Sequence, residues 1–308
     1  MATTPVTLPP GVSVFERGWL SSNCILIQGA QGNALIDSGY CTHADQTLAL
    51  VQSALQGQPL HQLLNTHLHS DHCGGNAALQ AAYPALRTSI PPGLADEVRR
   101  WDPQALTYEP TGQNCPRFTF DALLLPGTEM LLGDRTWQVH AAPGHDTHSV
   151  ILFEPVSRTL LSADALWERG FGVVFPQLDG DDAFAEVADT LDVIAALRPA
   201  LVIPGHGAPF TAVDTAIAVA RQRLDGFVVN PAKHLQYAAK VLLKFKLLEL
   251  QHVERTGLLQ WVQATPYFKA MFGQLYADLS LEVGVDRLVQ ELVRSGAATV
   301  EGNVVYNA

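Results

Sequence analysis

One segment, Thr66–His72, constrains this chain more than any other, because its sequence THLHSDH holds three histidines and an aspartate. The segment follows a short apolar run that is typical of a buried strand. In an extended segment, residues two apart point to the same side, so His67, His69 and Asp71 can meet in one cavity. His72 turns away from that cavity, which suits a second metal ion. The chain is therefore expected to fold so that a buried strand ends in a metal-binding cavity.

Three further side chains of the same chemical kind stand where apolar runs end. His145 follows Ala-Pro-Gly, His206 follows Ile-Pro-Gly, and Asp164 follows Leu-Leu-Ser-Ala. Open sheets present their sites along the edge where strands end, so these groups and Thr66–His72 can share one site. A lone histidine is more often a core residue, but this combination indicates a metal site. Imidazole and carboxylate ligands without thiolates suit zinc, with iron and manganese as alternatives.

Up to about residue 216, strand-like runs alternate with turns and helical segments. Residues 45–56 and 182–198 have helical periodicity, and residues 200–207 read as a buried strand followed by a turn. This mixture predicts the α/β or α+β class with layered sheets. Residues 90–120 are rich in proline and aromatic side chains and lack a regular pattern, which indicates an insertion or lid over a site.

A sharp change in charge predicts two domains. Residues 1–217 hold 9 arginines, no lysine and 22 acidic residues, whereas every lysine lies beyond them. The pattern turns helical in the same region, so we expect a catalytic domain over 1–216 and a smaller helical domain over 217–308. The chain ends in two β-runs around Glu-Gly-Asn, which predicts a hairpin. Helices followed by a hairpin have the outline of a winged helix, and a helical cap for dimerisation or pocket closure is the alternative.

The overall charge and the absence of long apolar runs exclude several classes of protein. The net charge of −11 disfavours binding to nucleic acids or anionic membranes. No apolar run approaches the length of about 18 residues that a membrane helix needs, and the N-terminus lacks the features of a signal peptide. The expected location is the cytoplasm. Lys240, Lys244 and Lys246 could form a basic stripe on one helix, but a solvated helix face is the preferred interpretation.

Five motifs between Val12 and Phe210 resemble the metallo-β-lactamase superfamily. They are IDSG at 36–39, HLHSDH at 67–72, PGH at 143–145, SAD at 162–164 and PGHG at 204–207. The resemblance implies an αββα sandwich, followed here by the smaller helical domain, with a dinuclear metal site at one sheet edge. It implies that the first metal is bound by His67, His69 and His145, the second by Asp71, His72 and His206, and that Asp164 bridges both. It implies that Asp37 supports the site without binding metal.

The resemblance also implies a water-activating centre. Two such metals lower the pKa of a shared water to about 7, and Asp71 can orient the resulting hydroxide and later carry its proton. Zinc β-lactamases typically carry Cys or Ser at the position of Asp164. Glyoxalase II, which this chain resembles around THLHSDHCGGN, typically has Gly-His-Glu-Tyr where Gly205–Ala208 stands. A dedicated β-lactamase is therefore disfavoured, and glutathione thioesters are in doubt.

The expected activity is metal-dependent hydrolysis of a small ester, thioester or lactone. A phosphodiesterase or ribonuclease of the same fold and a metal-binding regulatory protein are the alternatives. Aromatic residues of the 90–120 insertion and of the segment after Asp164 are expected to line the substrate pocket. These residues are Trp101 in the insertion, and Trp167 and Phe171 after Asp164. A homodimer is the expected assembly.

Overall fold

The computed structural model describes residues 6–308, and every structural statement below refers to that range. The chain divides into two compact units. Unit 1 comprises the chain up to Asp102 together with Cys115–Asp225, and unit 2 comprises Pro103–Asn114 and Gly226–Ala308. The division follows Asp225, whereas the expected boundary follows residue 216, and both positions lie inside helix α8 (Val213–Val229). The change in charge near residue 217 thus lies inside a helix.

The first sheet of unit 1 consists of β1 (Val12–Phe15), β2 (Cys24–Ile27), β3 (Ala34–Ile36), β4 (Gln62–Leu64), β5 (Arg87–Ile90) and β6 (Ala122–Leu123), in that order. The first three strands pair antiparallel, and β3 to β6 pair parallel. Because β3, β4 and β5 are parallel, their carboxyl ends lie at one edge of the sheet.

The second sheet of unit 1 consists of β7 (Glu129–Leu132), β8 (Arg135–Ala141), β9 (Val150–Glu154), β10 (Thr159–Ala163) and β11 (Leu201–Pro204). Its order is β11-β10-β9-β8-β7. β10 and β11 pair parallel, and the other neighbours pair antiparallel. Two antiparallel steps separate β8 from β10, so β8, β10 and β11 all end at the same edge.

Alternating side chains along the strands build two separate cores. Ile25 and Ile27 of β2 join Leu152 and Ile203 of the second sheet in a core between the sheets. The intervening Leu26 points to the opposite face, where it packs in a second core beneath helices. This period of two places one apolar layer between the sheets and another outside the first sheet.

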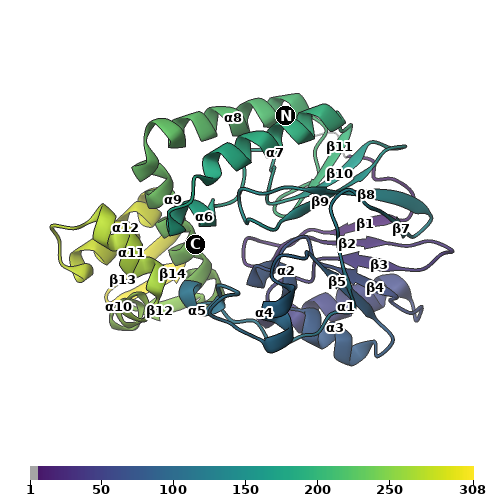
Figure 1. Ribbon diagram of the computed structural model, residues 1–308. Coiled ribbons are helices and arrows are strands. Elements are labelled where there is room, and N and C mark those ends of the chain that lie inside the picture. The colour runs from purple at the N-terminus through teal and green to yellow at the C-terminus, as the bar shows by residue number, and fades with distance from the viewer. Residues whose placement is uncertain (1–5) are drawn as a thin grey trace. The chain divides into compact units, whose positions relative to one another are not determined.

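Helices cover both outer faces of the paired sheets (Figure 1). Helices α1 (Ala44–Leu55) and α3 (Asn76–Ala82) lie on the first sheet, where Val51 and Leu79 pack against its outer face. Helix α7 (Ala183–Leu197) lies over the second sheet and buries one face, which includes Val187 and Leu191. Unit 1 is therefore an αββα sandwich, which confirms the expected fold class.

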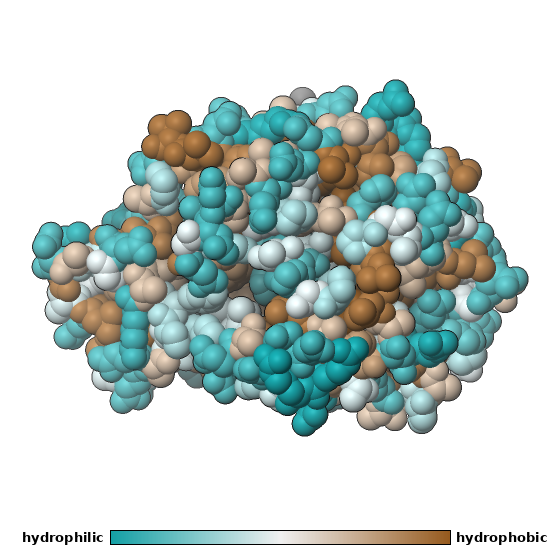
Figure 2. Space-filling model, in the orientation of Figure 1, coloured by the Kyte–Doolittle hydropathy of each residue, from teal (hydrophilic) through white to brown (hydrophobic). Residues whose placement is uncertain are grey.

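Short helices in unit 1 connect these elements. They are η1 (Cys41–His43), α2 (Ser70–Cys73), α4 (Ala95–Arg100) and α6 (Phe175–Asp179). Among residues 6–308, no helix has both the length and the apolar character needed to cross a membrane. On the face drawn in Figure 2, hydrophilic residues predominate and the apolar patches are small and separate.

Unit 2 is mainly helical and carries a small sheet. Its elements are α5 (Tyr108–Thr111), α9 (Pro231–Leu250), β12 (His252–Glu254), α10 (Arg255–Ala264), α11 (Pro266–Leu275), α12 (Leu281–Arg294), β13 (Ala298–Glu301) and β14 (Val304–Asn307). β13 and β14 form the terminal hairpin, and Gly302 in its turn has a φ of +56° that suits glycine. The strand β12, which the sequence analysis did not predict, pairs with β14.

The 90–120 segment is divided between the two units. Its central part contains α5, which contacts α11, and the indole Nε1 of Trp261 donates to the carbonyl of Gly112 at 3.4 Å. The irregular segment expected as one insertion therefore contributes residues 103–114 to unit 2. Contacts between residues that are distant in sequence decide this assignment, so local composition could not predict it.

Candidate metal centre

The ligands expected from the sequence follow the carboxyl ends of four strands. His67 and His69 come after β4, His145 after β8, Asp164 after β10 and His206 after β11. The strands of each sheet that precede these residues end at a shared edge, and the two sheets pack face to face. The two sheets thus form opposite walls of one site. The donor residues of this site come from distant parts of the chain.

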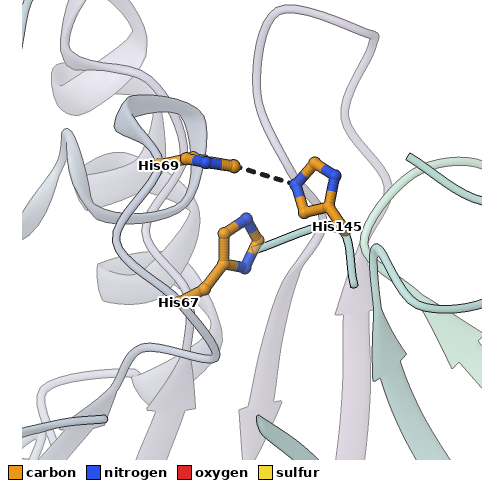
Figure 3. Close-up of side chains that lie close together, drawn as sticks. All are labelled: His67, His69 and His145. Atoms are coloured by element: carbon orange, nitrogen blue, oxygen red, sulfur yellow. Dashed lines mark hydrogen bonds between the residues drawn. The ribbon is translucent and has the colours of Figure 1, made fainter. Parts of the chain in front are cut away.

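Three histidines form the first group. His67, His69 and His145 offer ring nitrogens that all lie within 4.8 Å of one another. The Nδ1 of His69 is 2.8 Å from the Nε2 of His145. Figure 3 shows the three rings arranged around one space, with His69 and His145 directed toward each other. This is the donor group that the family resemblance assigned to a first metal.

A second group lies beside the first. Asp71, His72 and His206 also offer donor atoms within 4.8 Å of one another. The Nε2 of His206 is 3.2 Å from the Oδ2 of Asp71, and the Nε2 of His72 is 3.9 Å from the same oxygen. Asp71 and His72 belong to the short helix α2, which turns their side chains toward this second position.

Asp164 faces both groups. Its Oδ1 is 3.5 Å from the Nε2 of His72, and its Oδ2 is 3.5 Å from the Nε2 of His145. Oδ2 is also 3.8 Å from the Nε2 of His206. The Asp164 carboxylate therefore lies between the two groups and faces donors of both, as a bridging ligand requires.

Unsatisfied ring nitrogens indicate that the donors are arranged for metal ions. Among the residues that the structure describes, the Nε2 atoms of His67 and His72 are buried without a hydrogen-bond partner. A buried polar atom without a hydrogen-bond partner costs free energy, so these nitrogens are expected to have a partner of another kind. Bound cations would satisfy these nitrogens, and imidazole with carboxylate is a common donor set for divalent metals. The residues present therefore fit two divalent metal ions.

Neighbouring groups orient the histidine rings from outside the centre. The Nδ1 of His72 is 2.8 Å from the Oδ2 of Asp37. The backbone N–H and hydroxyl of Thr66 both donate to the Asp37 carboxylate. The Nδ1 of His145 donates to the carbonyl of Val173 at 2.5 Å. Such contacts fix which ring nitrogen is available to a metal. The role of Asp37 was expected, whereas no sequence signal pointed to Thr66 or Val173.

Burial keeps three of the histidines neutral. Desolvation lowers the pKa of His67 well below its ordinary value. It lowers the pKa values of His69 and His145 to about 4. Neutral imidazole is the form that binds metals, so these rings are ready to act as ligands near neutral pH.

The carboxylates reverse this effect for the other two histidines. Burial by itself would lower the pKa of His72, but Asp37, Asp164 and Asp71 outweigh it and raise that pKa well above its ordinary value. The pKa of His206 is raised in the same way against the effect of burial. Burial would raise the pKa of Asp164, but the neighbouring histidines lower it well below its ordinary value. Because metal ligands must be deprotonated, cations bound here would displace the protons of His72 and His206.

The three aromatic residues expected in the substrate pocket lie in different surroundings. The indole Nε1 of Trp167 donates to the Oδ1 of Asp164 at 3.2 Å, so Trp167 borders the centre. Trp101 packs edge-on against Phe118, with ring centroids 5.5 Å apart. Phe171 is 1% exposed and belongs to the core, so it offers almost no surface to a substrate.

Two aromatic residues beside the centre had no sequence signal. The indole of Trp19 stacks on the ring of His206 with centroids 5.4 Å apart and an angle of 11°. The ring of Phe175 lies edge-on to His69, with centroids 4.8 Å apart. Trp19 lies in the loop between β1 and β2 and Phe175 begins α6, and no motif marks either position.

The site and fold agree with a match to a known family. Residues 17–206 match the family described as the metallo-beta-lactamase superfamily. The chain belongs to this superfamily, and it is a metal-dependent hydrolase of the glyoxalase II-like branch.

Individual relatives support this assignment. The hydroxyacylglutathione hydrolase of Anaeromyxobacter dehalogenans is 32% identical over 74% of this chain and 80% of its own length. The solved structure of a beta-lactamase domain protein from Burkholderia ambifaria has a TM-score of 0.62 and 19% identity, and the match covers 100% of this chain and 97% of that one. A structure described as TTHA1623 in a di-iron-bound form has a TM-score of 0.50 and 27% identity over 71% of this chain and 98% of its own.

Proposed function

We propose that this protein hydrolyses a small ester, thioester or lactone with two zinc ions bound at the centre. The observation that carries the proposal is the pair of donor groups that share the carboxylate of Asp164. The complete set comprises seven residues. A site of this composition activates water and needs no serine or cysteine nucleophile.

The bound metal ions and the protein side chains would have different roles in the proposed reaction. Two bound divalent ions supply Lewis acidity and make a water molecule acidic enough to act as nucleophile near neutral pH. Asp71, whose side chain is 15% exposed, can accept a hydrogen bond from that water and carry its proton to the leaving group. Trp167 holds the Asp164 carboxylate in place through its indole N–H. The Val173 carbonyl and Asp37 hold the rings of His145 and His72.

The charge distribution favours an acyl substrate over a polyanion. The first 217 residues contain 22 acidic residues against 9 arginines and no lysine, which disfavours a nucleic-acid backbone. The Anaeromyxobacter dehalogenans relative carries the name of a thioester hydrolase, which supports the thioester as one candidate. Gly205–Ala208 lacks the tyrosine typical of glyoxalase II, so we do not extend the proposal to glutathione.

A substrate screen tests the proposal. Zinc-loaded protein is offered p-nitrophenyl esters, acyl thioesters, lactones and bis-p-nitrophenyl phosphate, with Asp164→Ala as the inactive control. Turnover of an acyl substrate that the variant loses supports the proposal. Turnover of the phosphodiester alone, also lost in the variant, would contradict it and favour the phosphodiesterase alternative.

Metal analysis tests the cofactor. We expect close to two zinc ions per chain after purification without chelator and His67→Ala to lower that number, with the exposed His252→Ala as the matched control. The di-iron neighbour makes iron the main competitor. Less than about one metal per loaded chain would contradict the dinuclear assignment.

Several further assignments remain proposals. They are a catalytic domain over 1–216, a helical domain over 217–308 that serves dimerisation or pocket closure, a homodimeric assembly and a cytoplasmic location. Trp101 and Trp167 remain proposed substrate contacts, and the core position of Phe171 argues against a direct contact. Sedimentation analysis would test the dimer.

A further inference from the structure

Trp19 is an exposed apolar side chain that directly precedes a buried stretch. Its relative exposure is 55%, whereas Leu20 is 4% exposed and the next residues, Ser21 and Ser22, are fully buried. A tryptophan that could be buried gains free energy from leaving water, so a rigid exposed one indicates a contact surface. Its position next to a metal-binding histidine makes that surface part of the site.

The loop that carries Trp19 is tied to both segments that hold the second donor group. The N–H of Ser22 donates to the carbonyl of Asp71 at 2.9 Å. The N–H of Asn23 donates to the carbonyl of Gly205 at 2.7 Å, and its side-chain amide donates to the carbonyl of Gly207 at 2.7 Å. These hydrogen bonds fix the position of the loop relative to Asp71 and His206. The loop therefore orients Trp19 before any substrate binds.

Three rings then form one continuous wall. Trp19 stacks on His206, and Trp167 lies edge-on to both, with centroids 5.2 Å from Trp19 and 5.5 Å from His206. Trp167 is itself fixed by its hydrogen bond to Asp164. Both indoles are thus immobilised by groups of the metal centre, and Trp19 keeps much of its surface open to solvent.

We propose that Trp19 and Trp167 form an aromatic subsite that binds the apolar group next to the scissile bond of the substrate. This assignment rests on the proposed hydrolase function. Two divalent ions outweigh the carboxylates of Asp71 and Asp164, so the loaded centre repels a cationic group that could otherwise stack on the indoles. Indole rings interact only weakly with anions, so an apolar chain or ring is the group that this surface binds best. The subsite therefore selects substrates by the size of their apolar group.

Two series of esters test this selection in zinc-loaded protein. One series lengthens the acyl chain from acetate to hexanoate on p-nitrophenol, and the other lengthens the alcohol of an acetate ester. We expect Trp19→Ala to lower kcat/KM for the longest member of one series by about fivefold or more, and for the shortest by less than about twofold. Trp19→Phe should keep most of the selectivity. Leu131→Ala, which alters a side chain that is 50% exposed on β7, is the matched control and should change neither value.

A binding measurement separates this inference from the proposed activity. Calorimetry compares acetate and hexanoate as ligands of zinc-loaded protein, with the zinc content of each variant measured alongside. We expect hexanoate to bind more tightly than acetate to the wild type, and Trp19→Ala to remove most of that difference without loss of zinc. If no ester, thioester or lactone turns over, the proposed activity fails and this comparison alone decides the subsite. Equal chain-length dependence in wild type and Trp19→Ala, in both ester series and in binding, would overturn the subsite.

Discussion

At the scale of single residues, Asp37 shows how the backbone serves the metal centre. Its φ of +58° is uncommon for a residue other than glycine, and such conformations persist when surrounding contacts determine them. Here the carboxylate accepts hydrogen bonds from Thr66 and contacts the ring of His72. One side chain thus joins the end of β3 to the segment that carries the ligands.

Replacement of this carboxylate should weaken metal binding without removing a ligand. In Asp37→Asn, the amide cannot accept from both Thr66 and His72, so the ring of His72 loses its fixed orientation. We expect the affinity of the second donor group for zinc to fall by about 10-fold to 100-fold. Competition with a coloured chelator measures this affinity. Unchanged affinity in a folded variant would show that Asp37 does not orient the ring.

At the scale of elements, the turn between β9 and β10 is held by a buried acid. Glu154 is 2% exposed and accepts hydrogen bonds from the N–H groups of Val156 and Ser157 and from the Ser157 hydroxyl. Burial would raise the pKa of Glu154, but these bonds and the nearby Arg135 outweigh it and lower that pKa. The turn fixes β10, whose carboxyl end carries Asp164.

The stability supplied by Glu154 should depend on pH. A carboxyl with a lowered pKa in the folded state stabilises the fold above its unfolded pKa of about 4.5, and loses that effect as the pH falls through the folded value. We expect Glu154→Gln to lower the free energy of unfolding by about 1–2 kcal/mol at pH 7. The difference from wild type should shrink below about pH 4.5. Urea titrations across this range measure it, and a difference independent of pH would contradict the ionised role.

At the scale of the whole molecule, the metal centre joins both sheets of unit 1. His67 and His69 follow a strand of the first sheet, whereas His145, Asp164 and His206 follow strands of the second. Ions bound among these residues would link the two layers of the sandwich at one edge. The metals should therefore contribute to stability as well as to chemistry.

Removal of metal should lower the melting temperature. Ligands that bind only the folded chain stabilise it, and metal held 100-fold above its dissociation constant contributes about 2.7 kcal/mol. We expect EDTA to lower the Tm of zinc-loaded wild type by several degrees. The same treatment should have little effect on Asp164→Ala, which has lost the shared ligand. An equal response of both proteins would indicate that the chelator acts elsewhere.

The three lysines of helix α9 that could form a basic stripe each contact another group of unit 2. Lys246 is 2.6 Å from a carboxylate oxygen of Glu249, Lys240 is 3.6 Å from Glu291, and Lys244 donates to the backbone carbonyl of Ala297. These contacts leave less positive charge available than the three lysines suggest. We expect no salt-sensitive shift of duplex DNA or single-stranded RNA at micromolar protein and low salt. A shift that disappears with added salt would contradict this expectation.

Local patterns in the sequence predicted the donor residues and the layers of the fold. The donor histidines can be recognised from a few neighbouring residues. They lie two residues apart in an extended segment, or they follow Pro-Gly at the end of a strand. The terminal hairpin was predicted for the same reason, because the turn around Gly302 needs a residue that tolerates positive φ. Period-two alternation in β2 likewise follows from the geometry of a strand.

Only the tertiary structure placed Trp19 over His206, gave Thr66 and Val173 their supporting roles and assigned residues 103–114 to unit 2. Each of these results depends on contacts between segments distant in sequence, which no local pattern encodes. Phe171 shows the same limit, because its position after Asp164 suggested a pocket wall while packing placed it in the core. The sequence by itself determined which atoms can bind metal and the period of each strand. Long-range packing decided which other side chains surround them, because burial depends on the whole fold.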